Sequence, residues 1–169
     1  MNKIKIPFFI IALSIFLFFS VPLFAVDKGD VAPAFVLTDL NNNYIFSKNI
    51  YGKNWVLVDF YATWCVNCNK ELPHIEDLYN DYKDMGLDVY LLAADKEGRD
   101  ILLPHFSKSP TVLTVLVDKY QKAVEAFGVS ELPAVFLVNK EGKIAYKMTG
   151  FNEDEMNSLR SFLSEALNE

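Results

Sequence analysis

The chain has 169 residues, of which 51% are apolar and 22% charged, a composition typical of one globular domain with a substantial core. Its formal net charge is −6, and it becomes −8 when Lys3 and Lys5 are left out. Phosphate backbones are bound by clustered Lys and Arg, so this acidic balance argues against nucleic acid as a partner.

The N-terminus has the pattern of an export signal. Two lysines precede an apolar run over residues 6–19, and the small residue Ala25 closes the segment after a helix-breaking proline. We therefore predict a signal peptide over residues 1–25 and one domain over residues 26–169. The apolar segment is also about 20 residues long, so a retained membrane anchor is the alternative. Both outcomes place the domain in the periplasm or another extracytoplasmic compartment.

Strands and helices alternate along the rest of the chain. Strands are predicted over 34–38, 44–46, 55–61, 87–93, 111–117, 134–138 and 143–147. Helices are predicted over 65–85, 99–107, 120–127 and 152–167, with a short one capped by Ser47. Pro73 is expected to kink the first long helix, and Pro104 is expected to interrupt the second.

This order of elements predicts an α/β fold. The run over residues 55–61 is apolar on both faces, which is typical of a central strand covered on both sides. Alternating strands and helices imply parallel strands, and the hairpin over 134–147 adds antiparallel ones. We expect a central mixed β-sheet flanked by helices on both faces, with an N-terminal β-hairpin extension.

The two cysteines, Cys65 and Cys68, are three residues apart, where a buried strand leads into a helix. A disulfide that closes so small a loop adds little stability, so the pair points to chemistry. A helix N-terminus favours a thiolate, which predicts Cys65 as the attacking group and Cys68 as the resolving one. A structural zinc site needs four ligands, and His74 and His105 lack a suitable spacing, so we predict no metal ligand and give neither histidine a role.

Two acids accompany the cysteines as candidate catalytic residues. Asp59 interrupts the apolar strand, where burial would raise the pKa of its carboxyl and suit it to shuttle the proton of Cys68. Its alternative is an acid at a strand edge that reaches water. Glu71 lies one helical turn after Cys68, where its charge would act on the pair. Its alternative is an exposed acid paired with a lysine.

The motif around the cysteines resembles a known family. The run over 58–68, Val-Asp-Phe-Tyr-Ala-Thr-Trp-Cys-Val-Asn-Cys, is similar to the active-site strand of the thioredoxin superfamily. Residues 68–73, with Cys, Glu and Pro, resemble its branch of TlpA/ResA-like thiol–disulfide oxidoreductases. Segments 32–35 and 132–143 are also similar to that branch. The resemblance covers about residues 29–167.

The resemblance implies a thioredoxin fold and no cofactor apart from a redox-active disulfide of the cysteine pair. It places Asp59 beneath the pair and Glu71 beside it. It also implies a cis peptide before Pro133, with the backbone of Leu132 facing the substrate near the cysteines. Trp64, Leu132 and Pro133 are accordingly expected to bind substrate.

The resemblance implies a dithiol reductase that acts on disulfide-containing exported proteins, with the haem-site cysteines of apocytochrome c as one client. A membrane electron donor is expected because the chain has no second cysteine pair. Asn67 stands where many members have proline, and its extra N–H would make the pair somewhat more oxidising. The alternatives are a thiol oxidase of exported proteins and a copper-handling module.

Overall fold

The computed structural model describes residues 25–168, so the predicted export segment lies outside the described residues except for Ala25. No helix within the described part is both long and apolar enough to cross a bilayer. The strands are β1 (Val36–Asp39), β2 (Tyr44–Phe46), β3 (Trp55–Tyr61), β4 (Leu87–Ala93), β5 (Thr114–Val117), β6 (Ala134–Val138) and β7 (Ile144–Thr149). The helices are α1 (Ser47–Ile50), α2 (Val66–Tyr82), α3 (Arg99–Lys108), α4 (Lys122–Phe127) and α5 (Glu153–Ala166), and a 3-10 turn (Lys83–Met85) extends α2.

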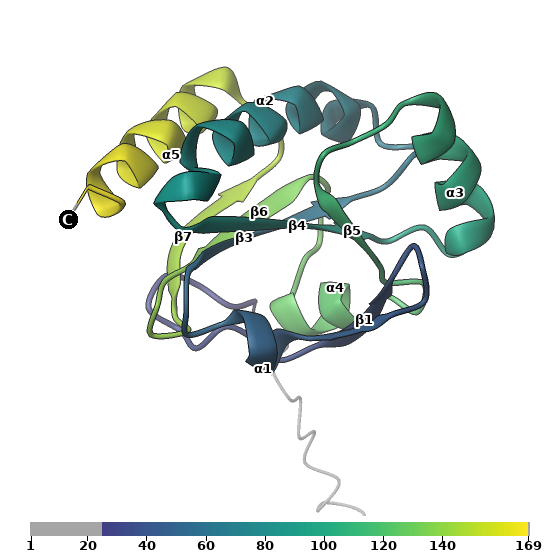
Figure 1. The fold of residues 1–169 in the computed structure, drawn as a ribbon, viewed down its shortest axis with the longest axis horizontal. Helices are drawn as coiled ribbons and strands as arrows, with labels where there is room; N and C mark the ends of the chain where they lie inside the picture. Colours follow the sequence, from purple (N-terminus) through teal and green to yellow (C-terminus); the bar gives the residue numbers. More distant parts are fainter. Residues whose placement is uncertain (1–24, 169) are drawn as a thin grey trace, which may run out of the picture.

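The strands form one mixed sheet in the order β2-β1-β5-β4-β3-β6-β7. Strands β3, β4 and β5 are parallel, whereas β6 is antiparallel to β3 and β7 is antiparallel to β6. The hairpin of β1 and β2 forms the edge of the sheet next to β5, because β1 pairs antiparallel with β5 (Figure 1). The predicted mixed sheet with an N-terminal hairpin is therefore confirmed.

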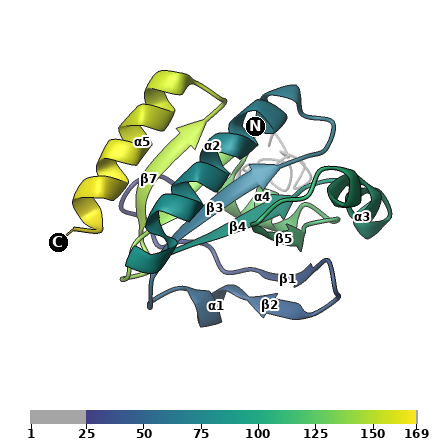
Figure 2. The same ribbon diagram turned by 45° about the horizontal axis from the view of Figure 1, so that its top comes forward.

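The central strand β3 divides its side chains between two cores. Leu57, Asp59 and Tyr61 alternate with Val56, Val58 and Phe60, and all of these side chains are buried. Helices α2, α3 and α5 cover the face of Leu57 and Tyr61, while α1 and α4 lie on the other face (Figure 1). Figure 2 shows α2 and α5 running side by side across the sheet. Both faces are thus covered, as the apolar run of β3 predicts.

The two internal prolines do not end their helices. Helix α2 continues past Pro73 to Tyr82, and α3 continues past Pro104 to Lys108. The predicted interruption at Pro104 is wrong, because the loss of one backbone N–H is outweighed by packing on both sides of it. Leu102 and Phe106, two residues before and after this proline, are buried in the core.

Two boundaries differ from the prediction for a local reason. The strand expected over 111–117 begins only at Thr114, since Thr111 Oγ1 donates to Glu76 Oε1 at 2.6 Å and so holds the start of this segment against α2. Ser47 begins α1 but does not cap it. Its hydroxyl instead accepts a hydrogen bond from the Phe35 amide at 2.9 Å.

Candidate active site

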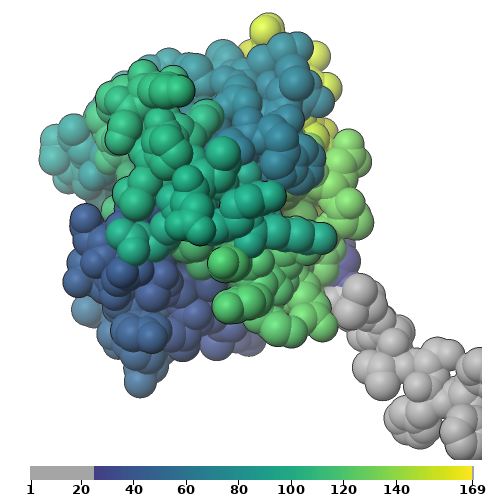
Figure 3. Space-filling view, turned by 90° about the vertical axis from the view of Figure 1, so that its right-hand side faces the viewer, coloured from purple at the N-terminus to yellow at the C-terminus, as the bar shows by residue number. Residues whose placement is uncertain are grey.

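Three parallel strands end at one edge of the sheet, and the cysteine pair lies there. Strand β3 leads into the loop over 62–65, Asp95 follows β4 after one residue, and Asp118 follows β5 directly. Figure 3 looks onto the side that carries α3 in Figure 1, and it shows the start of α2 (blue) beside α3 (green). The carboxyl edge of parallel strands is where α/β sheets hold their ligands.

Cys65 and Cys68 form a disulfide with an S–S distance of 2.07 Å. Cys65 is the N-cap residue of α2 and has extended backbone, and its Sγ accepts a hydrogen bond from the Cys68 amide at 3.1 Å. This donor belongs to Cys68 rather than to Asn67. Cys65 is 7% exposed and Cys68 is 1% exposed, so the residue predicted to attack is less exposed than expected but remains the more exposed of the two. The N–H groups of the first turn provide donors for a thiolate at Cys65.

Asp59 is buried on the face of β3 that Leu57 and Tyr61 share, the side of the sheet whose core contains both cysteines. It is 1% exposed and is paired across the sheet with Leu91 and Val135, which are fully buried. Its Oδ1 has no hydrogen-bond partner among the described residues. Burial raises the pKa of the Asp59 carboxyl to about 7. The alternative of an acid at a strand edge that reaches water is wrong, and the sheet holds a buried carboxyl whose pKa lies near neutral pH.

Glu71 is also buried, although it belongs to the first turns of a helix. Its side chain is not exposed, and neither carboxylate oxygen has a partner within the described residues. Burial, followed by the charge of Asp59, raises the pKa of the Glu71 carboxyl, so this group is neutral at pH 7. The alternative of an exposed acid paired with a lysine is therefore wrong. Asp59 and Glu71 therefore share the core with the cysteines, and ionising both carboxyls at once is unfavourable in free energy.

Of the three residues expected to bind substrate, two line one hollow at the protein surface and the third, Pro133, does not. Trp64 is 68% exposed, and with Leu132 it lines a hollow of about 450 Å³. The other lining residues are Ala94, Gln121, Val124, Val129, Ser130 and Glu131. The Leu132–Pro133 peptide is cis, as the resemblance implies, and Pro133 itself is buried at the start of β6. An extended client segment would meet an exposed indole and several apolar side chains here.

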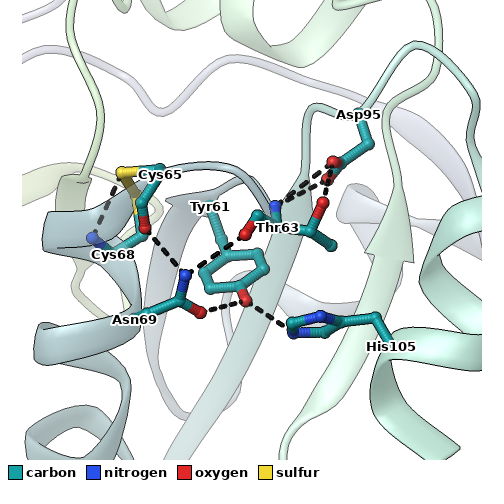
Figure 4. The surroundings of a disulfide bond; sticks show 7 residues. All are labelled: Tyr61, Thr63, Cys65, Cys68, Asn69, Asp95 and His105. Atoms are coloured by element: carbon teal, nitrogen blue, oxygen red, sulfur yellow. Dashed lines mark hydrogen bonds between the residues drawn. A yellow bond between two sulfur atoms is a disulfide. The ribbon is translucent and has the colours of Figure 1, made fainter.

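Sequence reasoning missed a set of polar residues behind the cysteines. Tyr61, Asn69 and His105 form a chain of hydrogen bonds, and Asp95 binds Thr63 (Figure 4). His105 is half-buried against the ring of Tyr61 rather than free on the surface. These residues lie up to 44 positions apart in the chain, so no local pattern reveals them.

A metal centre finds no support in the geometry. Within residues 25–168, no three side chains of His, Cys, Asp or Glu lie close enough together to hold an ion. His74, the other histidine, packs against the ring of Phe151 with a centroid distance of 5.4 Å.

Known proteins similar to this chain carry thiol–disulfide activity in their names. The model of the AhpC/TSA family matches residues 28–147. The ResA thiol–disulfide oxidoreductase of Bacillus thuringiensis (strain Al Hakam) is 38% identical over 123 residues, which are 72% of this chain and 69% of the relative. The ResA of Bacillus subtilis (strain 168) is 34% identical over 133 residues, which are 78% and 73% of the two chains.

Solved structures give the same result. A protein of Chlorobium tepidum described as a DsbE-type thiol:disulfide interchange protein superposes with a TM-score of 0.78 at 27% identity, covering 84% of this chain and 99% of its own. The thioredoxin domain of a thiol–disulfide oxidoreductase from Bacteroides vulgatus superposes with a TM-score of 0.71 at 28% identity, covering 82% and 99%. The predicted resemblance to the ResA-like branch is confirmed.

Proposed function

From the premise that this chain belongs to the AhpC/TSA family and is a thiol–disulfide oxidoreductase of the ResA/DsbE type, we propose that it works as a dithiol reductase of exported proteins. The observation that carries the proposal is the cysteine pair itself. Cys65 lies at the N-terminus of α2, with the Cys68 amide on its sulfur and two neutralisable acids in the core behind.

The proposed reaction moves two electrons from the cysteine pair to a client disulfide. The Cys65 thiolate attacks one client sulfur, forms a mixed disulfide and releases the other client sulfur, which takes up a proton. Cys68 then gives its proton to the carboxylate of Asp59 and attacks Cys65. The bond between Cys65 and the client breaks, and the released client sulfur takes up a proton from solvent, so that the client leaves as a dithiol. The Cys65–Cys68 disulfide remains, and Asp59 returns its proton to solvent. Glu71 stays protonated and so limits the negative charge beneath the pair.

The direction of the reaction is tested by the reduction potential. We expect a value nearer to that of a reducing thioredoxin, about −270 mV, than to that of a strong periplasmic oxidase, about −120 mV. Equilibration with glutathione buffers, followed by alkylation of free thiols, measures it. A value near the oxidase end would assign the protein to the alternative function, a thiol oxidase of exported proteins.

Export is part of the proposal and rests on the N-terminal sequence. We expect cell fractionation to recover the protein outside the cytoplasm, either free after cleavage at Ala25 or held at the membrane by residues 1–25. Deletion of that segment should move the protein to the cytosol without loss of thiol content. Recovery of the intact chain from the cytosol would contradict the proposed compartment.

The proposed partners follow from the single cysteine pair. Each turnover leaves the disulfide form, so a membrane dithiol donor must reduce the pair again. The clients are exported proteins with accessible disulfides, and the haem-site cysteines of apocytochrome c are the class that the resemblance favours. The copper-handling alternative is not proposed, because no observation in the described residues favours it.

A further inference from the structure

A chain of side-chain hydrogen bonds supports the loop that carries Cys65. Asn69 donates from Nδ2 to two carbonyl oxygens of that loop, to Cys65 O at 3.0 Å and to Thr63 O at 3.2 Å. Its Oδ1 lies 2.7 Å from the Tyr61 hydroxyl, and that hydroxyl lies 2.9 Å from His105 Nε2. Figure 4 shows the chain running from α3 through β3 to the disulfide.

The carbonyl partners fix the direction of every proton in this chain. Since Nδ2 of Asn69 faces two carbonyls, Oδ1 must accept, and the Tyr61 O–H must donate to it. The Tyr61 oxygen is then left to accept, so His105 Nε2 must carry a hydrogen. Burial, with the charges of Asp95 and Asp59, raises the pKa of Tyr61 to about 12, which keeps its hydroxyl protonated. All donors and acceptors in this chain of hydrogen bonds are therefore satisfied in one arrangement of the protons only.

The same loop is held from its other side by Asp95. This buried carboxylate accepts from the Thr63 amide at 3.1 Å and from Thr63 Oγ1 at 2.6 Å. Thr63 is therefore bound through its amide, its hydroxyl and its carbonyl. Trp64 and Cys65, the next two residues, have their backbone placed by these contacts while the indole remains 68% exposed.

We propose that Tyr61, Asn69 and His105 are positioning residues for disulfide exchange, because they hold Cys65 at the N-cap of α2 in the extended conformation that brings its sulfur to the Cys68 amide. None of the three contacts the sulfurs in the hydrogen bonds described. Their effect passes through the Cys65 and Thr63 carbonyls to the orientation of the Cys65 side chain. The proposal rests on the thiol–disulfide function above.

The test compares the reactivity of Cys65 in reduced, purified full-length variants. Asn69→Leu removes the hydrogen bonds of both Nδ2 and Oδ1 and keeps a side chain of similar volume, whereas Tyr61→Phe removes a single hydroxyl. We expect the pH profile of iodoacetamide alkylation at Cys65 to move up by about half a unit in Asn69→Leu and by less in Tyr61→Phe, since the thiolate loses part of its amide donor. The rate with a small aromatic disulfide should fall about threefold at pH 6.5.

His105 provides the sharpest control because its role is to donate one hydrogen. His105→Leu should behave like Tyr61→Phe, whereas His105→Gln, whose amide N–H replaces Nε2–H, should restore the wild-type profile. His74→Leu, at the other histidine, should leave the profile unchanged. Thermal unfolding of each variant separates this effect from a loss of stability.

Two outcomes would overturn the proposal. One is an unchanged alkylation profile in both Asn69→Leu and Tyr61→Phe, and if Asn69→Leu does not fold, Tyr61→Phe decides alone. The other is an equal shift in His105→Gln and His105→Leu, which would remove His105 from the chain. A wild-type protein that exchanges with no disulfide would instead refute the proposed function itself.

Discussion

The Cys68→Ser variant is expected to capture its clients as covalent complexes. Cys65 keeps its place at the helix N-terminus and still attacks, but the sulfur that would release it is gone. Release must then wait for a free thiol in solution, and we expect it to slow about a thousandfold or more, because an intramolecular attack becomes a bimolecular one. Complexes from an extract of exported proteins, separated without reductant, would identify the clients.

Cys65→Ser is the matched control for the trap. It leaves Cys68 as the only thiol, and since Cys68 is 1% exposed, we expect no captured protein. Alkylation of the reduced wild type should modify Cys65 first, and below the pKa of about 8.5 of a free thiol. Capture by Cys65→Ser, or an empty Cys68→Ser trap, would show that the roles of attacking and resolving cysteine are assigned wrongly.

Asp59→Asn is expected to slow the second half of the reaction near neutral pH. The substitution replaces the carboxylate that we propose accepts the proton of Cys68 with an amide of almost the same shape. We expect resolution of a preformed mixed disulfide on Cys65 to slow about 10²-fold at pH 7, the lower end of general-base effects. At pH 9 hydroxide can remove the proton of Cys68 instead, so the difference in rate between the variant and the wild type should become smaller. Equal rates in both proteins from pH 6 to 9 would exclude Asp59 from proton transfer.

The same substitution should change how stability depends on pH. Burial raises the folded-state pKa of Asp59 from its ordinary value of 3.8 to about 7, so the unfolded chain releases this proton first as the pH rises. The contribution of Asp59 is complete below pH 4 and is lost up to about pH 7, a change of about 4 kcal/mol at most. In the oxidised Asp59→Asn variant, the free energy of unfolding measured with denaturant should lack this part of the decline with pH.

A surface acid gives the control for this measurement. Glu141→Gln removes an exposed carboxylate from the turn between β6 and β7. We expect its decline in stability with pH to follow that of the wild type. If the stability of Asp59→Asn declines with pH as steeply as that of both of these proteins, folding does not raise the pKa of Asp59.

Local features of the sequence were enough to predict the fold and the position of the cysteine pair in it. An apolar run broken only by Asp59 indicates a strand buried on both faces, and a cysteine pair directly after it indicates a helix N-terminus. Both inferences need only neighbours in the chain. The same is true of the turn at Gly128, where a positive φ of 63° ends α4 as predicted.

Features that depend on tertiary packing could not be predicted in this way. The sequence left Glu71 undecided between an acid that acts on the cysteine pair and an exposed acid paired with a lysine, and it did not predict the burial that the placement of α2 over the sheet produces. Pro104 appeared to break a helix that core contacts hold together. The chain from His105 to Asn69 joins three elements, and its members have ordinary residue types without a distinctive spacing.

The central place of β3 in the sheet should also make its backbone amides exchange slowly with solvent. This strand is bonded along its length to β4 on one side and to β6 on the other, and its side chains are buried on both faces. Its amides should therefore exchange with deuterium only when the whole domain opens, on a scale of hours or longer. Thiol exchange at the end of the strand can recur many times within that interval. The backbone amides that exchange most slowly in the domain therefore lie next to the cysteines in the sequence. We expect β3 to keep its hydrogen bonds through every catalytic cycle.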